Sequence, residues 1–124
     1  MSNSPLVTYT RLSPNYTAPR NHVTDTISIH CVVGQLTAQE ILAMDMFTVY
    51  NPTNGSSCTY AVGTDGSIGQ GVDEANRSWC TSSRSNDHRA ITIEVASDKP
   101  HPYAVNDKAM TALLERRGDI MQRH

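Results

Sequence analysis

Charged residues and long apolar segments are both scarce in this sequence. Asp, Glu, Lys and Arg together make up 18% of the 124 residues, and the formal net charge is -2. General binding to nucleic acids or membrane surfaces needs clustered Lys and Arg, so the composition argues against both functions. No apolar run approaches the roughly 18 residues of a transmembrane helix. Residues 1–21 lack the basic start and apolar block of a secretory signal, so we expect synthesis in the cytoplasm.

Cysteine is also scarce, and its distribution excludes two further classes. The three cysteines are Cys31, Cys58 and Cys80. An odd number without close pairing argues against a disulfide framework. No CxxC motif is present, so a structural zinc knuckle is not expected. The length fits a single domain spanning residues 1–124.

Several segments have the patterns that predict β-strands. Residues 26–33 and 90–97 alternate apolar and polar side chains, so each strand has one apolar and one polar face. Two shorter strands, at 58–63 and 67–72, are joined at TDGS, where Asp65-Gly66 favours a tight hairpin turn. The sheet is therefore built from strands distributed along the chain.

Helices are expected between and after these strands. Thr37 has the position of an N-cap, with Glu40 completing a capping box, and helical spacing continues to about Phe47. The polar residues 1–24 are expected to form an extended arm. The resulting order of elements predicts an α/β fold, a small mixed central sheet flanked by helices. A second helix begins at about Tyr103, with an apolar stripe formed by Ala104, Met110, Leu113, Leu114, Ile120 and Met121.

Two polar side chains on the strands are candidates for chemistry. His30 is on the polar face at the carboxyl end of its strand, where it can direct an imidazole nitrogen into a cleft or bond to a loop carbonyl. Cys31 points to the opposite face and is expected in the core. Glu94 is a carboxylate in mid-strand, a position that strands disfavour. It is either a solvated side chain or, in a partly dry pocket, a general base with a raised pKa.

Other candidates are open to two interpretations each. Trp79, next to Cys80 in a polar connection, can line a groove for a sugar or peptide, or it can pack at the edge of a small hydrophobic core. Tyr60 can donate a hydrogen bond to an oxyanion or simply pack in its strand. His88 is expected to be a solvated loop residue. No HExxH, GxSxG, P-loop or dinucleotide-binding pattern is present, so no single motif decides the reaction.

Four blocks, in their order and spacing, carry a resemblance to a known family. ISIHCVVG, CTYAVGTDGSIGQGVDE, RSWCTSS and RAITIEVAS resemble the zinc-dependent N-acetylmuramoyl-L-alanine amidases of phage endolysins and bacterial autolysins. The resemblance extends from about residue 7 to 123. It implies the fold shared with peptidoglycan recognition proteins, peptidoglycan as the substrate, and action on the cell wall, with holin-type release as one route.

The resemblance also implies roles for individual residues. His30 matches the zinc-binding His at the end of the family's first strand, and Glu94 matches the catalytic carboxylate. Tyr60 is expected to assist catalysis, on the same face as Cys58, which replaces a Tyr common at the start of the hairpin. Trp79 and Cys80 match the family's WHAG loop; they and Cys58 are expected to contact substrate. The implied reaction is zinc-assisted hydrolysis of the amide bond between N-acetylmuramic acid and L-alanine.

Two zinc ligands that the resemblance implies are not found. In the family, a late His is followed by a Cys or Asp just before Pro-Gly, and neither occurs before His124. Three explanations stay open: a C-terminally incomplete chain, a site completed by a second chain, or a module that binds muropeptides without cutting them. Cys58, Cys80 or His88 can also supply substitute ligands across the pocket.

One further expectation concerns association, and one alternative to the resemblance stays open. The last helix would expose an apolar face, which favours self-association. The remaining alternative is an unrelated small α/β protein in which His30 and Glu94 are structural. Bound zinc and cleavage of cell-wall material distinguish these interpretations.

Overall fold

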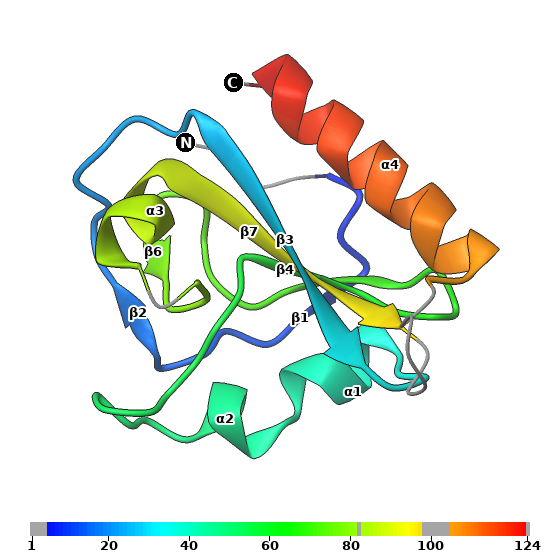
Figure 1. Cartoon of the computed structure of the whole chain (residues 1–124), viewed down its shortest axis with the longest axis horizontal. Helices are drawn as coiled ribbons and strands as arrows, with labels where there is room; N and C mark the ends of the chain where they lie inside the picture. Colours follow the sequence, from blue (N-terminus) through cyan, green and yellow to red (C-terminus); the bar gives the residue numbers. More distant parts are fainter. Residues whose placement is uncertain (1–4, 82, 98–104, 124) are drawn as a thin grey trace.

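The structure, a computed structural model, describes residues 5–81, 83–97 and 105–123, which form three layers (Figure 1). A five-stranded sheet in the order β1-β5-β4-β7-β3 lies between helix α4 on one face and helices α1 and α2 on the other. A second, two-stranded sheet pairs β2 with β6. The strands are β1 Tyr9–Thr10, β2 Tyr16–Thr17, β3 Thr26–Val33, β4 Tyr60–Val62, β5 Ile68–Gln70, β6 Arg77–Ser78 and β7 Ala90–Ser97; the helices are α1 Ala38–Leu42, α2 Asp45–Thr48, α3 Arg84–Arg89 and α4 Asp107–Arg123.

The central sheet is mixed, as the sequence predicts. β3 and β4 both run parallel to β7, β1 runs parallel to β5, and β4 and β5 form an antiparallel hairpin. β3 and β7 coincide with the predicted strands at 26–33 and 90–97, whereas the hairpin strands are shorter than predicted. Gly66 in the hairpin turn has φ +82°, a left-handed conformation that glycine adopts without steric cost. The Asp-Gly signal therefore predicted the turn correctly.

The predicted capping box is present at the start of α1, but the helix is shorter than expected. The Thr37 hydroxyl oxygen accepts a hydrogen bond from the Glu40 N–H, and the Glu40 carboxylate accepts one from the Thr37 N–H, at 3.1 and 3.0 Å. The helix was predicted to reach Phe47, yet it ends at Leu42 and α2 begins at Asp45. Leu42 and Phe47 are both buried in the same cluster. In one continuous helix they would lie roughly 140° apart around the axis, so the break lets both reach the core.

Two apolar clusters fill the spaces between the layers. One lies between the sheet and α4, and the other lies between the sheet and α1 and α2. The first contains Tyr60, Val62, Ile68, Ile91, Ile93, Val95, Ala109, Ala112, Leu113 and Ile120. The second contains Ala38, Ile41, Leu42, Phe47, Cys58, Ala61 and Ala96. Alternate residues of β4 and β7 thus serve opposite cores, so each strand has two distinct faces.

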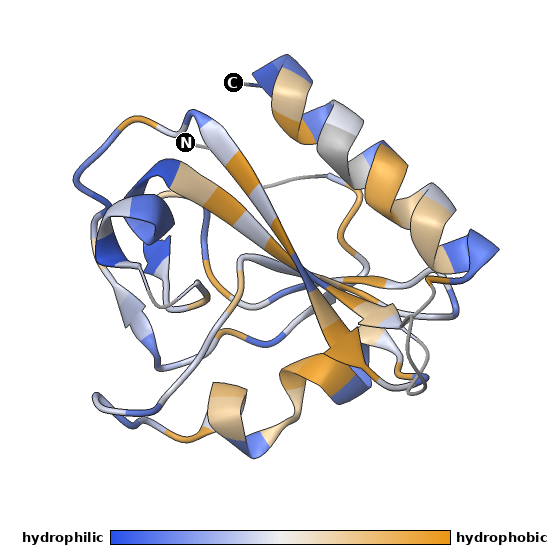
Figure 2. Cartoon of the chain, in the orientation of Figure 1, coloured by the Kyte–Doolittle hydropathy of each residue, from blue (hydrophilic) through white to orange (hydrophobic). Residues whose placement is uncertain are grey.

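Helix α4 carries apolar and polar residues in alternation along its length (Figure 2), and it buries only part of its predicted apolar stripe. Leu113 and Ile120 are buried, while Met110, Leu114 and Met121 are exposed. Ala109 and Ala112, which precede Leu113, are also buried against the sheet, and their small side chains allow close approach. The predicted helix start at Tyr103, with Ala104, lies outside the described residues. Within the described ranges, no helix, α4 included, has the length and apolar character needed to cross a bilayer.

Strand β3 forms one edge of the sheet, which corrects the prediction for Cys31. Cys31 was expected in the core but is exposed, as are Ile29 and Val33 on the same strand face. The reason is that α4 packs mainly over β4 and β7 and meets this edge strand near its start, at Ile27. Whether the exposed apolar residues support self-association stays a prediction.

The described part of the N-terminal arm is more structured than the sequence suggested. It contributes β1 to the central sheet and β2 to the small sheet. Arg20 is buried at its end and anchors the segment between β5 and β7. Its guanidinium donates hydrogen bonds to five backbone carbonyl oxygens, those of Glu74, Asn76, Asp87, His88 and Ala90. The arm thereby supports the segment that carries the candidate site.

Candidate active site

The parallel pairing of β3 with β7 brings two predicted site residues together. His30 and Glu94 are register partners, so their side chains leave the sheet on the same face. On the other side of β7, Glu94 is paired with Ala61 of β4, whose small side chain leaves space around the carboxylate. His30 is exposed and Glu94 is partly buried. An accessible imidazole therefore lies beside a partly desolvated carboxylate.

Cys80 joins this pair from a different part of the chain. It follows β6, and its thiol donates a hydrogen bond to Oε1 of Glu94 at 3.3 Å. The backbone N–H groups of Cys80 and Thr81 donate to the buried Asp87 carboxylate of α3, at 3.2 and 3.1 Å, which fixes the loop. The ligand atoms of His30, Cys80 and Glu94 all lie within 4.8 Å of one another. The fold thus assembles an N, S and O donor cluster from β3, β7 and this loop.

Burial governs the protonation of the cluster. It raises the pKa of the Glu94 carboxyl, and the Cys80 thiol and His30 oppose this shift. Burial, reinforced by the negative charge of Glu94, also raises the pKa of the Cys80 thiol. The thiol is consequently an S–H donor at neutral pH. Glu94 is a stronger base than an exposed carboxylate, as general-base catalysis requires.

The three side chains match the donor types that zinc binds in proteins. Imidazole nitrogen, thiolate sulfur and carboxylate oxygen bind zinc at about 2.0–2.3 Å, which places tetrahedral donors roughly 3.3–3.8 Å apart. Cys80 and Glu94 are already 3.3 Å apart, and no pair in the cluster exceeds 4.8 Å. The exposed His30 side chain has room to rotate toward the other two. His30 and Cys80 can therefore hold a zinc ion, with the Glu94 carboxylate beside it as a further donor or as a base.

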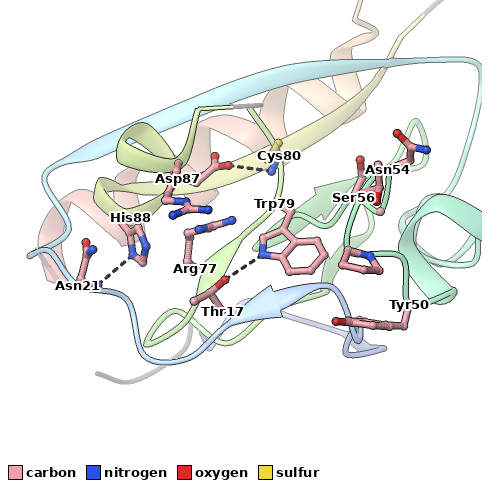
Figure 3. A pocket seen from close by; sticks show the side chains of 14 residues that line it. Thr17, Asn21, Tyr50, Asn54, Ser56, Arg77, Trp79, Cys80, Asp87 and His88 are labelled. Carbon is pink, nitrogen blue, oxygen red and sulfur yellow. Dashed lines mark hydrogen bonds between the residues drawn. The ribbon is translucent and has the colours of Figure 1, made fainter.

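A groove of about 880 Å³ adjoins the cluster at Cys80 (Figure 3). Trp79 lines it, and its indole N–H donates to the Thr17 hydroxyl at 3.0 Å. The Arg77 guanidinium carbon lies 6.0 Å from the centre of the Trp79 ring, and the Tyr50 ring centre lies 6.4 Å away. Of the two interpretations that the sequence left open for Trp79, the structure shows the groove-lining one.

Sequence reasoning missed several polar residues of this groove. Arg77 and Arg84 both line it and give one side positive charge, and Asp87 anchors the loop of Cys80. These residues lie in the polar connection that was expected to lack regular structure. One local signal was available: Ser83 is an N-cap whose hydroxyl accepts from the Asn86 N–H and starts α3. The signal would have placed Asp87 on a helix, but not against Cys80.

Comparison with known proteins decides the family. A sequence model of the N-acetylmuramoyl-L-alanine amidase family matches residues 19–124. The chain belongs to this family. Its activity by family is therefore that of a peptidoglycan amidase, as the resemblance implied. No protein with a curated description matches the sequence significantly.

Two solved structures share the fold of the amidase. A selenomethionine derivative of AmpD is 17% identical, with a TM-score of 0.75 over 100% of this chain and 80% of that chain. The endolysin N-acetylmuramoyl-L-alanine amidase LysCS from Clostridium intestinale is 19% identical, with a TM-score of 0.69 over 99% of this chain and 78% of that chain. These likenesses support the α/β fold with a mixed central sheet.

The amidase places Tyr60 on the face opposite the cluster, whereas Cys58 is buried next to Glu94 and Cys80. Tyr60 is paired in register with Ile93 and not with Glu94, so it faces α4, where its buried hydroxyl donates to the Glu74 carboxylate. Cys58 is buried in the apolar cluster beneath α1, and burial, reinforced by the nearby Glu94 and Cys80, raises the pKa of its thiol. The two side chains therefore lie on opposite faces, and neither lines the groove.

His88 also differs from its prediction. It was expected to be solvated, but it is buried in the last turn of α3. Its Nδ1 accepts a hydrogen bond from the Asn21 N–H at 3.0 Å. Burial, together with the nearby charges of Arg77 and Arg20, lowers the pKa of His88. His88 lines the groove as a neutral side chain of the amidase and is outside the His30 cluster.

Proposed function

We propose that the amidase cleaves the bond between the lactyl group of N-acetylmuramic acid and L-alanine of the stem peptide with a zinc ion bound by His30. The observation that carries the proposal is the convergence of His30, Cys80 and Glu94 beside the groove. Zinc would make a water molecule more acidic and polarise the scissile carbonyl.

Glu94 is the proton carrier in this proposal. Its carboxylate is partly buried beside His30, and its raised pKa brings its basicity closer to neutral pH. Glu94 takes the proton of the attacking water and delivers it to the leaving amine of L-alanine. The small partner Ala61 leaves room for this exchange. Tyr60 has no part in it, because its hydroxyl is held by Glu74 on the other face.

The groove supplies the substrate-binding surface. We assign the Trp79 and Tyr50 rings to contacts with the sugar or the apolar parts of the stem peptide, because aromatic faces bury such groups well. Arg77 and Arg84 are suited to the carboxylates of an acidic stem peptide. Cys80 both lines the groove and belongs to the donor cluster, so substrate in the groove would lie next to the cluster. On this proposal the chain acts on the cell wall, with holin-type release as one route.

The test is cleavage of a purified muropeptide in the presence of zinc. We expect new L-alanine amino termini, and we expect Glu94→Gln to reduce their rate of release by about 10²–10⁴-fold. Glu115→Gln is the matched control, because Glu115 is an exposed carboxylate on α4. Activity of Glu94→Gln equal to that of the control would contradict the role of Glu94. Muropeptide binding without cleavage by the unmodified protein would instead support the alternative of a non-catalytic binding module.

A further inference from the structure

The loop that carries Cys80 is held in place on both sides. The Cys80 N–H donates to Asp87, and the Thr81 hydroxyl donates to the same carboxylate at 2.8 Å. On the other side, the Trp79 N–H donates to the Ser57 hydroxyl at 2.9 Å. Asp87 and Ser57 are both buried. The position of the Cys80 thiol beside Glu94 is thus fixed by the backbone around it.

Of the three cysteines, only Cys80 has its sulfur among the donor atoms. Cys31 is exposed on the opposite face of β3 from His30, and Cys58 is buried in an apolar cluster. A thiol is a weak hydrogen-bond donor, so a hydroxyl would serve better if the only task were to bond Glu94. A thiolate, in contrast, is a strong zinc ligand. The presence of a thiol rather than a hydroxyl beside Glu94 therefore indicates metal binding by Cys80.

We infer that the Cys80 thiolate is a second protein ligand of the ion bound by His30. When the ion binds, the S–H bond breaks, a metal–sulfur bond forms, and the proton leaves to solvent. Glu94 then loses the hydrogen bond that it accepts from the thiol at 3.3 Å, and its Oε1 is released to accept another proton. Binding of the metal ion to Cys80 is in this way coupled to freeing the Glu94 carboxylate for proton transfer. The inference rests on the proposed function, since it shares the ligand His30.

The test is titration of the full chain with cobalt(II), which reports thiolate ligation by a charge-transfer absorption band in the near ultraviolet. We expect the band in the unmodified protein and in Cys31→Ser, and we expect its loss in Cys80→Ser. Cobalt and zinc affinity should fall in Cys80→Ser by more than the ~10–100-fold that loss of an outer-shell partner costs. Absence of the band from the unmodified protein at saturating cobalt would overturn the inference, as would an unchanged band in Cys80→Ser.

A second measurement needs no variant and applies even if Cys80→Ser fails to fold. Zinc should slow alkylation of Cys80 by iodoacetamide in the unmodified protein, with the modified residue located by mass spectrometry. The exposed Cys31 is the internal control and should react at the same rate with and without zinc. Equal rates for Cys80 in both conditions would overturn the inference.

The two proposals fail in different ways. A cobalt band from Cys80 without muropeptide cleavage would retain the metal site and reject the proposed function. Zinc-dependent cleavage with no thiolate band would retain the proposed function and reject Cys80 as a ligand. The experiments on Cys80 and Glu94 therefore report on separate steps.

Discussion

His30 and Glu94 lie on the same face of the sheet because β3 and β7 pair them in register. The edge position of β3 leaves His30 exposed, while Glu94 on the inner strand β7 is partly buried. The pairing therefore combines a side chain that a metal can reach with a carboxylate of raised pKa. A site of this kind needs only two neighbouring strands and one loop.

Replacement of His30 should remove both metal binding and activity. Zinc contributes several kcal/mol of transition-state stabilisation, so we expect His30→Ala to lower muropeptide cleavage by at least ~10³-fold. The measurements are cleavage rate and zinc affinity by competition with a chelating dye. His22→Ala is the control, because His22 is an exposed histidine outside the cluster. Undiminished zinc binding in His30→Ala would show that the ion is held elsewhere.

Replacement of Trp79 should affect substrate binding more than chemistry. Its ring lines the groove but is not part of the donor cluster. We expect Trp79→Ala to raise KM about tenfold, or about 1.4 kcal/mol, with kcat within roughly twofold of its original value. Trp79→Phe keeps an aromatic face and loses the bond to Thr17, so it should be intermediate. A fall in kcat at unchanged KM would be inconsistent with a binding role.

The Glu74 carboxylate should be important for stability. Glu74 is fully buried, and Arg123 at the end of α4 donates to both of its oxygens, at 2.9 and 2.6 Å. Arg123 keeps its ion pair with Asp119, but Glu74→Ala removes its charge-assisted hydrogen bonds to a buried carboxylate and the acceptor of the Tyr60 hydroxyl. The free energy of unfolding should therefore fall by about 3 kcal/mol. Urea denaturation measures this change, with the exposed Glu115→Ala as the control. A loss no larger than that of the control would mean that the pair does not stabilise the fold.

The Asp25–Arg89 ion pair should make stability depend on acid pH. The Arg89 guanidinium, 2.7 Å away, and the Thr26 hydroxyl lower the pKa of Asp25 to about 2. Because the folded-state pKa is below the unfolded value of about 3.9, the stabilisation is present above pH 4 and is lost as the pH falls toward 2. Thermal unfolding should therefore show Asp25→Asn as slightly less stable than the unmodified protein at pH 6, with the difference gone near pH 2. A difference that persists unchanged at pH 2 would exclude this ion pair as its source.

The exposed edge strand should mediate self-association. Ile29 and Val33 are each 47% exposed on β3, and unprotected edge strands with apolar side chains tend to pair with other chains. Sedimentation velocity over a concentration series should show association of the unmodified protein and its loss in Ile29→Lys. Val23→Lys, at an exposed position before the strand, controls for the added charge. A monomer at every concentration would refute this prediction.

The local signals of the sequence predicted the elements well where short-range physics decides them. The capping box of Thr37 and Glu40 satisfies backbone groups within one turn of helix, and the Asp65-Gly66 turn depends on the freedom of a single glycine. The alternation in 26–33 and 90–97 predicted both long strands. The polar segment before β7 gave no apolar period, so α3 and the burial of its His88 were missed.

The sequence by itself determined that His30 and Glu94 are on polar strand faces, because side chains alternate along any strand. Only the tertiary structure decided that β3 pairs with β7, that Cys80 reaches Glu94, and that Tyr60 faces away from both. These outcomes depend on strand register, on the loop held by Asp87, and on which face each helix covers. All three are set by contacts between residues far apart in the chain, which no local pattern encodes.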